Sequence, residues 1–237
     1  MVHYTDSETL IEQLKASTKE DQLFVDCGLI DYSTALDLQM RMQRLRIEDQ
    51  IPDTILLLEH PPVLTLGIRK EKNRLLTERA ILEAQGVQII QIQRGGGVTA
   101  HNPGQLVVYP IVKIPSRRIR VVPYIRFLEN LCITLAARYG IEAHRRNRLP
   151  GVWVGEKKLA SVGVQIIKGV TIHGIAMNIT NDLELFSSII PCGLEGVVMT
   201  SMAELSAEVT LQSMQSNKEF VIEQSMGFLS ENPRIRS

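Results

Sequence analysis

The sequence predicts an α+β fold in a single domain, with a mixed or antiparallel sheet flanked by helices. Strand-like segments cluster in hairpins along the chain rather than alternating strictly with helices, which disfavours a doubly wound parallel sheet. The chain has 237 residues, of which 44% are apolar, and it contains no low-complexity linker and no internal repeat. We therefore expect one domain over residues 1–237.

The first third of the chain predicts a strand, a helix and a strand pair. The run QLFVDCG at 22–28 is typical of a strand, and a helix is expected over 33–47 because apolar residues recur at helical spacing. The strands TILLLEH at 54–60 and VLTLG at 63–67 are separated by a Pro-Pro turn. The apolar face of the helix consists of Ala35, Leu38, Met42 and Leu45.

The middle third predicts a short helix followed by two strands. The helix covers 77–85, with Thr77 as its N-cap and Gly86 at its end. The strands VQIIQIQ at 87–93 and QLVVYPIVKI at 105–114 flank a glycine-rich run.

The last part of the chain begins with the strongest predicted helix, at 123–139. Pro123 suits its first turn, and Gly140 ends it. Its apolar stripe consists of Tyr124, Leu128, Leu131, Leu135 and Tyr139. Three strands are expected next, at 151–155, 158–167 and 170–179, and a helical tail covers about 208–230, with its helix at 211–229.

Composition excludes several classes of protein. The 26 basic and 26 acidic residues cancel, which argues against a protein whose whole surface binds nucleic acid. Charges or prolines interrupt every apolar run before 18 residues, so no membrane span is expected. The N-terminus lacks the features of a secretory signal, and three widely spaced cysteines do not form a disulfide scaffold. We expect a cytoplasmic protein with reduced thiols.

The densest group of unusual residues is RGGGVTAHNPGQLVVYP at 94–110. Three consecutive glycines permit positive φ and let backbone N–H groups approach a ligand closely. A structural hairpin turn explains the glycines equally well, and neither a P-loop ending nor a GxGxxG helix start is present. Arg94, Thr99, His101 and Gln105 crowd around the glycines, which a purely structural turn does not require. This crowding favours a binding site.

Three further residues are candidates whose roles the sequence leaves open. Lys158 starts a strand, where a lysine is usually solvated, and His173 interrupts an apolar strand, where a hydrogen-bonded core histidine is the commoner case. Cys192 lies between a proline and a glycine and could be core filler, half of a disulfide, a metal ligand or a nucleophile. No HExxH or CxxC spacing joins the histidines or cysteines, so no metal is expected.

In combination, these motifs resemble one known family. RGGGVTAHNPGQL, GVWV…KKLASVGV, HGIAMNI and PCG occur in the order and rough spacing of the lipoyl(octanoyl) transferase family, and the resemblance covers about residues 22–202. LEHPPVLTLG at 58–67 is similar to that family's early strand pair. Lipoate and biotin ligases share the glycine run, whereas Lys158 together with Pro191-Cys192-Gly193 is more specific. The resemblance implies a biotin/lipoate protein ligase-like fold.

The resemblance also implies a reaction and its partners. Members of this family move octanoyl from acyl carrier protein to a lysine of lipoyl domains, in the E2 subunits of 2-oxoacid dehydrogenases and in the H protein of glycine cleavage. No ATP, metal or other cofactor is expected, because thioester exchange is close to neutral in free energy and transfer to an amine is downhill. Neither nucleic acid nor a membrane is an expected partner, and we expect a monomer.

The family assigns Cys192 as the acyl-carrying nucleophile and Lys158 as its partner. Two departures from the family's first motif affect the shape of the acyl site: Ala100 replaces a common aromatic residue, and Asn102 replaces a common glycine. The resemblance implies an acyl-binding tunnel formed by Arg94, Gly95, Gly96, Gly97, Val98, Thr99, Ala100, His101, Ser161, Val162, Gly163, His173, Gly174, Ile175 and Ala176.

Two basic clusters are candidate docking surfaces for the acidic protein substrates of this family. They are Arg117, Arg118 and Arg120 in SRRIR, and Arg145, Arg146 and Arg148 in HRRNR. The alternatives are an ATP-dependent lipoate or biotin ligase, which needs no nucleophilic cysteine, and a non-catalytic module that binds an acylated carrier. A cysteine hydrolase would need His101 or His173 as its base.

Overall fold

The computed structural model describes residues 1–231, except the side chains of Cys192 and of residues 229–231. The larger of its two sheets contains β1 (Val2–His3), β2 (Gln22–Leu29), β3 (Asp53–Glu59), β7 (Gln105–Ile111), β8 (His144–Arg146), β9 (Leu149–Val154), β10 (Lys157–Ile167) and β11 (Val170–Asn178). Its strand order is β1-β2-β3-β7-β11-β10-β9-β8. The first three strands pair in parallel and the later pairs are antiparallel. This mixed sheet confirms the predicted α+β class.

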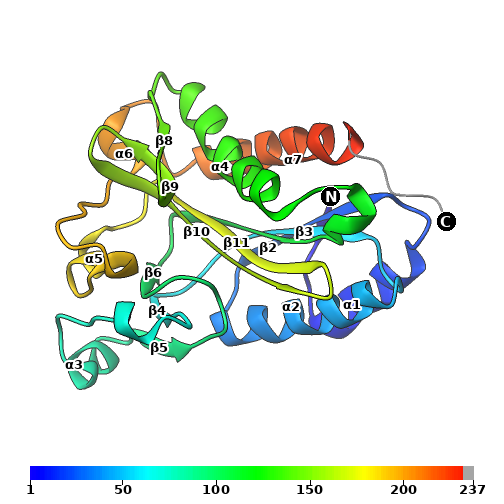
Figure 1. The fold of residues 1–237 in the computed structure, drawn as a ribbon, viewed down its shortest axis with the longest axis horizontal. Helices are drawn as coiled ribbons and strands as arrows, with labels where there is room; N and C mark the ends of the chain where they lie inside the picture. The colour runs from blue at the N-terminus through cyan, green and yellow to red at the C-terminus, as the bar shows by residue number, and fades with distance from the viewer. Residues whose placement is uncertain (232–237) are drawn as a thin grey trace.

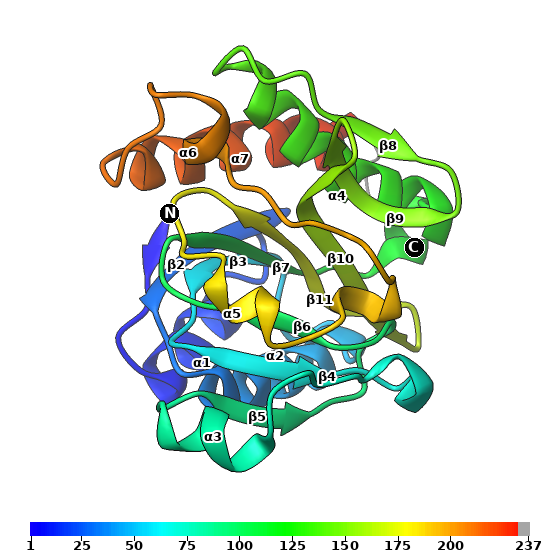
Figure 2. The ribbon, with the colours of Figure 1, turned by 90° about the vertical axis from the view of Figure 1, so that its left-hand side faces the viewer.

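A second sheet has three strands in the order β5-β4-β6. It contains β4 (Val63–Leu66), β5 (Gln88–Gln91) and β6 (Thr99–His101). Figure 2 shows this sheet with a short helix, α3 (Arg79–Ala84), at one end of the molecule. The sequence predicts β4 and β5 but not β6, which lies in the glycine-rich run, and it does not predict that these strands leave the main sheet.

Four helices cover the two faces of the large sheet. They are α1 (Ser7–Ala16), α2 (Tyr32–Ile47), α4 (Val121–Ala137) and α7 (Ser213–Glu231). Figure 1 shows α4 and α7 on one face, with α1 and α2 on the other. Asp6 and Asp31 cap α1 and α2, because each carboxylate accepts hydrogen bonds from two free N–H groups of the first turn.

The remaining helical elements are short and lie near the loops. They are α5 (Glu184–Ser187), α6 (Met202–Leu205) and the 3₁₀ turns Lys70–Lys72, Ile114–Arg117 and Pro191–Gly193. The sequence does not predict them, nor β1, α1 and β8. Most of these elements are so short that they carry too few residues to show a hydrophobic period.

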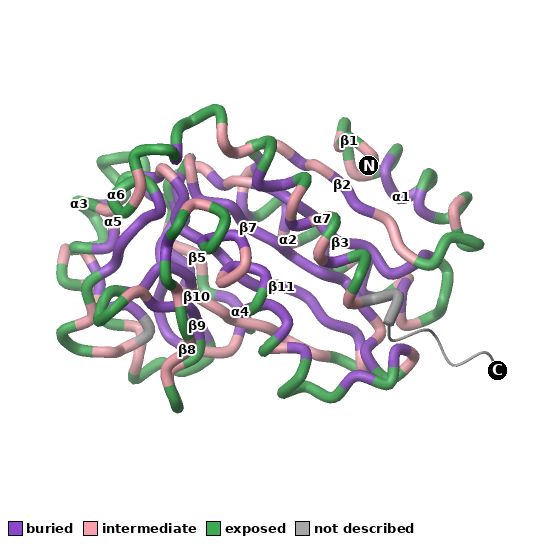
Figure 3. The backbone as a smooth tube through the Cα atoms, turned by 90° about the horizontal axis from the view of Figure 1, so that it is seen from above, coloured by how far each residue is buried: buried purple, intermediate pink, exposed green. Residues whose placement is uncertain are grey.

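The hydrophobic core lies in two layers, one on each face of the large sheet. One cluster joins α4 and α7 to the sheet through residues such as Leu128, Leu135 and Val221, and the other joins α1 and α2 through Leu14, Leu38 and others. The central strands are buried along most of their length, as Figure 3 shows. Burial on both faces explains why β3 and β7 are almost continuously apolar rather than alternating.

Most predicted elements occur within two residues of their expected bounds, but the cap of α3 is a correction. Its N-cap is Glu78 rather than Thr77, and no side chain caps this helix. Gly86 does follow its end, at φ +80°, a left-handed conformation that suits glycine. In α4, Pro123 lies in the first turn, as predicted, although the helix starts at Val121.

Candidate active site

The predicted tunnel segments of β10 and β11 lie directly opposite each other in the sheet. Ser161 pairs with Ala176, Val162 with Ile175, and Gly163 with Gly174. The antiparallel register therefore brings together two motifs that are separated in the sequence. The two motifs form one continuous wall of the site. The small sheet contributes β6 to the same site.

The glycine-rich run follows β5 and is packed backbone to backbone against the chain after β4. A Cβ atom on Gly67 would lie 2.2 Å from the Gly96 carbonyl oxygen, and one on Gly97 would lie 2.4 Å from that of Lys72. No side chain fits at these distances. The glycines at these two points are therefore required by close approach of the backbone, independently of any ligand.

Arg94 is buried beneath this loop, with an exposed fraction of 7%. Its guanidinium donates to the carbonyl oxygens of Gly95 (2.8 Å) and Gly97 (2.9 Å) and to Thr65 Oγ1 (3.0 Å). A Cβ on Gly163 would lie 2.5 Å from Arg94 Cδ, so the arginine occupies space that a side chain would otherwise fill. Arg94 has no carboxylate partner among the described residues. The positive charge of Arg94 is instead stabilised by the carbonyl oxygens of the glycine-rich loop that its guanidinium contacts.

An inner cavity of about 20 Å³ lies between β6, β10 and β11. Its volume is that of about one water molecule, so it is nearly closed in this conformation. Its lining is mainly small residues and aromatic or polar groups. They are Arg94, Thr99, His101, Tyr109, Ser161, Val162, Gly163, Gly174, Ile175 and Ala176.

His101 and Tyr109 of this lining belong to a cluster of ring contacts that also contains Tyr32, His60 and His173. His60 Nδ1 lies 2.8 Å from the Ile30 carbonyl oxygen and its Nε2 lies 3.0 Å from the Tyr109 hydroxyl. His101 Nδ1 lies 2.7 Å from Gln105 Oε1. Burial lowers the pKa of His60 to about 4 and that of His101 well below its usual value. Both rings are therefore neutral at pH 7.

His173 lies behind Tyr109, with ring centroids 6.1 Å apart. Burial first, and then the nearby charge of Arg94, lower its pKa to about 3. Its backbone adopts φ +57°, which is unusual for a non-glycine residue inside a strand. Neither ring nitrogen has a hydrogen-bond partner among the described residues, and its backbone N–H donates to Gln39 Oε1 (2.8 Å).

Lys158 is buried on β10, with an exposed fraction of 1%, rather than solvated. The register of β9 and β10 shifts between Lys158 and Ala160, and this bulge sets the direction of the lysine. Its ammonium lies 5.5 Å from the Trp153 ring centroid. Gly151, at φ +119°, makes room for it, because a Cβ there would lie 2.8 Å from Lys158 Cε.

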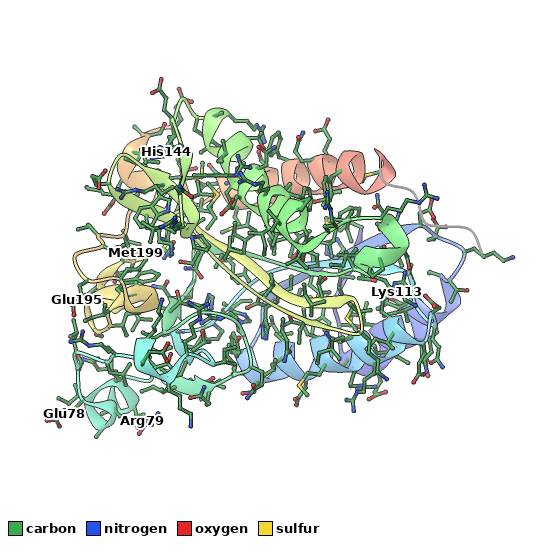
Figure 4. All side chains as sticks on the ribbon, in the orientation of Figure 1. Glu78, Arg79, Lys113, His144, Glu195 and Met199 are labelled. Atoms are coloured by element: carbon green, nitrogen blue, oxygen red, sulfur yellow. The ribbon has the colours of Figure 1, made fainter. Side chains whose placement is uncertain are left out.

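The segment that follows the Cys192 turn is tied to Lys158 through the backbone. The Lys158 N–H donates to the Val198 carbonyl (2.8 Å), and the Thr200 N–H donates to the Lys158 carbonyl (3.0 Å). Figure 4 labels Met199, the bridge partner of Lys158 on this segment, beside the end of β10. The Cys192 side chain lies outside the described residues, but its 3₁₀ turn spans Pro191–Gly193.

An outer cavity of about 270 Å³ joins these elements. It shares Val162 and Gly163 with the inner cavity, so the two are adjacent. Leu194, two residues after Cys192, lies in its wall together with Lys158. The complete lining is Arg69, Lys72, Gly95, Gly96, Ile125, Arg148, Leu149, Pro150, Lys158, Val162, Gly163, Val164 and Leu194.

Four predicted tunnel residues line neither cavity. Val98 and Ala100 face a separate apolar cluster with Leu64 and Phe186, because alternate residues of a strand point to opposite faces. Gly97 is enclosed by Lys72, and His173 lies behind Tyr109. The difference between Ala100 and the aromatic residue common in the family therefore falls outside the cavity wall.

The sequence does not indicate several lining residues, most notably Tyr109, Lys72 and Leu194. Tyr109 shares a motif with the predicted residues, and its aromatic ring in an aliphatic strand was an available signal. Lys72 and Leu194 belong to loops that only the tertiary structure brings to the site. Asn102 donates to the Asp182 carbonyl (2.7 Å) and accepts from Asn181 (3.1 Å), so it braces the loop after β6.

The predicted docking cluster of Arg117, Arg118 and Arg120 needs correction at Arg117. Arg117 is buried and paired with Asp53 (2.7 Å), which also pairs with Arg46 (2.6 Å). It holds the core together and is not available to a partner protein. Arg145, Arg146 and Arg148 instead lie on β8 and the turn before β9, beside the outer cavity.

Residues 1–231 show neither a metal cluster nor a membrane-spanning helix. In this part of the chain no group of three or more His, Cys, Asp or Glu residues is placed to hold a metal ion. No helix over the same residues has the length and apolar character needed to span a membrane.

Comparisons with known proteins agree with the geometry. The sequence model described as the lipoyl protein ligase A/B catalytic domain matches residues 31–223. A protein named octanoyltransferase from Syntrophobacter fumaroxidans is 43% identical over 181 residues, covering 76% of this chain and 79% of its own. One of the same name from Chloroflexus aggregans is 46% identical over 179 residues, covering 74% and 81%. The structure of LipL1 from P. falciparum in complex with lipoate superposes with a TM-score of 0.68 at 14% identity, covering 91% of this chain and 65% of that one.

Proposed function

Because the chain belongs to the lipoyl protein ligase A/B catalytic domain family, we propose that it transfers octanoyl from octanoyl-acyl carrier protein to a lysine of lipoyl domains. The chain is an acyltransferase that acts in protein lipoylation. The carrier-bound donor, the lipoyl domains of E2 subunits and of glycine cleavage H protein as acceptors, and a thioester on Cys192 are the specific parts of the proposal. The observation that carries it is that Lys158 and Leu194, the residue directly after the Cys192 turn, line one cavity, which adjoins the inner cavity.

In the first half of the reaction, the Cys192 thiolate attacks the carbonyl carbon of the octanoyl thioester. The new carbon–sulfur bond forms as the bond to the phosphopantetheine sulfur breaks, and the departing thiolate takes up the proton of the Lys158 ammonium, which leaves the Lys158 amine neutral for the second half. A free thiol is only a few per cent ionised at neutral pH, so a nearby cation favours the reactive form. Lys158 is the group proposed to supply it.

In the second half, the neutral ε-amine of the acceptor lysine attacks the octanoyl-cysteine thioester. A carbon–nitrogen bond forms, the carbon–sulfur bond to Cys192 breaks, and the amine loses a proton. Lys158 is the proposed proton acceptor at this step. Since a thioester becomes an amide, the transfer needs no ATP and no metal.

Both tetrahedral intermediates require hydrogen-bond donors for their oxyanion. The amide of Gly95 donates to the Val164 carbonyl (3.2 Å) and that of Gly193 to the Ile190 carbonyl (3.0 Å), so both are engaged. Among the described residues, no acceptor is bonded to the amides of Gly96 and Gly97. Of these two, Gly96 lines the outer cavity, and its N–H is the proposed donor.

The octanoyl chain binds by burial of its methylene groups. At about 0.8 kcal/mol per methylene, the tail contributes up to about 5 kcal/mol before ordering costs. The inner cavity, at about 20 Å³, has to widen to receive this chain. We propose that the small residues of β10 and β11 form the slot that opens.

Intact-protein mass spectrometry tests the proposal. The protein is mixed with octanoyl-acyl carrier protein in the absence of ATP, beside a Cys192→Ala variant. We expect an octanoyl adduct on the wild-type chain only, and its loss when a lipoyl domain is added. Cys27→Ala is the matched control, because Cys27 is buried and its pKa is raised to about 12 by burial.

The ATP-dependent ligase is the rival with the same fold, and the same assay separates the two. If no adduct forms and the lipoyl domain is modified only from free octanoic acid with ATP, the transferase proposal is wrong. If the carrier binds without either reaction, the chain is a binding module.

A further inference from the structure

A third cavity continues the outer cavity on the side away from the acyl slot. We call it the arginine cavity; it has a volume of about 420 Å³, within the range of small-molecule sites. It shares Ile125, Arg148, Leu149 and Pro150 with the outer cavity, which in turn shares two residues with the inner cavity. The arginine cavity is lined by Val122, Ile125, Arg126, Glu129, Arg145, Arg146, Asn147, Arg148, Leu149 and Pro150.

Four arginines and one carboxylate line this cavity, so it carries an excess of positive charge. The carboxylate of Glu129 accepts from Arg145 (2.9 Å) and from the Gly151 amide (3.1 Å), which commits it to neighbouring groups. Neither Arg126 nor Arg148 has an ion-pair partner among the described residues. Arg146 pairs with Glu156 (2.9 Å), so the charges available to a ligand are those of Arg126 and Arg148.

Two of the arginines are held in fixed positions. Arg145 also donates to the Arg126 carbonyl (2.8 Å), and Arg146 lies over the Trp153 ring at 5.0 Å from its centroid. Arg148 occupies the turn before β9 with φ +62°. Figure 1 shows this β8–β9 hairpin beside α4, the helix that carries Arg126. The cluster thus combines two elements, and only the fold brings them together.

Guanidinium groups that converge on a concave cavity suit a small anion with several oxygen atoms. The planar guanidinium presents its N–H donors in a geometry that matches a phosphate group. Several guanidinium groups that converge on one cavity neutralise a single phosphate better than they match the dispersed carboxylates of a broad acidic protein surface. The ligand favoured here is therefore a phosphate ester rather than a carboxylate-rich protein face.

We propose that the arginine cavity binds the phosphodiester of the prosthetic arm that carries the acyl donor. This inference rests on the proposed function. Along such an arm the phosphate comes first, the thioester lies at the far end, and the acyl chain follows. The arginine, outer and inner cavities adjoin in the same order. Phosphate binding thus sets how far the arm enters and places the thioester beside Lys158.

The test compares two donors that differ only in the phosphate, octanoyl-4′-phosphopantetheine and octanoyl-pantetheine. The measured quantity is the KM of each in transfer to a lipoyl domain. For the wild-type protein we expect the phosphorylated donor to have a KM lower by about tenfold to a hundredfold, the range of hydrogen bonds to a charged group. Equal KM values would overturn the inference and leave the proposed function intact.

The variant Arg126→Gln assigns the effect to the cavity. We expect the ratio of the two KM values to fall toward one in this variant and to stay at its wild-type value in Arg44→Gln. Arg44 lies on α2, against the opposite face of the sheet, and its loss changes the net charge equally. An unchanged ratio in Arg126→Gln, with an unchanged melting temperature, would contradict the inference. Absence of transfer from both donors and from octanoyl-acyl carrier protein would instead contradict the proposed function.

Discussion

Lys158 owes its position to specific neighbours. Gly151 leaves the space for its side chain, and two backbone hydrogen bonds fix it to the segment that follows the Cys192 turn. A lysine buried with an exposed fraction of 1% is costly unless its charge is used or compensated. Its burial in the wall of the outer cavity is what makes it a candidate for proton transfer.

Replacing Lys158 by methionine tests this role. Methionine keeps an unbranched stem of similar length, so we expect the melting temperature to change little. Loss of the proton-transferring group lowers kcat by about 10² to 10⁴-fold, the usual contribution of general acid–base catalysis. Steady-state transfer to a lipoyl domain measures it. Lys157→Met, at the exposed neighbouring residue, is the control, and an equal loss of kcat in both variants would contradict the role.

At the scale of single residues, the sequence predicts chemistry better than orientation. The polar crowding around the glycines indicates a site, and Arg94, Thr99 and His101 do line the inner cavity. Ala100 lies in the same short strand but faces the other way, because the phase of a three-residue strand is set by its partners. The burial of Arg117 against Asp53 likewise depends on tertiary contacts, and the sequence does not reveal it.

At the scale of elements, close approach between β10 and the glycine loop shapes the acyl site. Gly163 leaves space that the Arg94 side chain fills, and the Gly95 amide donates to the Val164 carbonyl (3.2 Å). The strand and the loop therefore support each other. The regular strands were predictable from their apolar pattern, but this contact was not, since it depends on how the small sheet packs on the large one.

The variant Gly163→Ala tests this contact, with Gly227→Ala as its matched control. A Cβ at Gly163 would lie 2.5 Å from Arg94 Cδ, so the buried arginine must move. We expect a destabilisation of about 1–3 kcal/mol, typical of overpacking, and a clear loss of kcat/KM for octanoyl transfer. Chemical denaturation and steady-state kinetics measure the two effects.

The control change has the opposite sign. Gly227 lies on α7, where a Cβ would meet no atom within 4 Å, and alanine is a better helix former than glycine. We therefore expect Gly227→Ala to stabilise the protein by about 0.5–1 kcal/mol without affecting transfer. If both substitutions had the same effect on stability, the contact between Gly163 and Arg94 would not be the cause.

At the scale of the whole molecule, two layers of core support a site that lies between two sheets. The large sheet supplies the wall formed by β10 and β11, while the small sheet and the Cys192 segment close it from the other side (Figure 2). The sequence predicts the longer strands but not β1, β6 and β8, and it does not predict the division into two sheets, because pairing between distant strands is not encoded in local periodicity. The arginine cavity arises at this scale as well, from α4 and the β8–β9 hairpin.

The interior of this site also makes the stability of the whole molecule depend on pH. Burial is the main cause that lowers the pKa of His60 to about 4, that of His173 to about 3, and that of His101 well below its usual value. In the unfolded chain a histidine titrates near 6.5. As the pH falls below about 6.5, the unfolded state therefore takes up protons that the native state does not bind.

Stability is thus complete above about pH 6.5 and declines as the pH falls toward 4. Each buried histidine removes up to about 1.4 kcal/mol of unfolding free energy per pH unit. Urea denaturation between pH 7.5 and 5 measures the slope in a window above the carboxylate titrations. His173→Asn removes one of the three sites, and asparagine tolerates the φ of +57° at this position. We expect the slope to fall by about one third in this variant.

A wild-type protein equally stable at pH 7.5 and pH 5 would show that these rings are protonated in the native state. The charge of Arg94 beside them would then have to be balanced by a rearranged site.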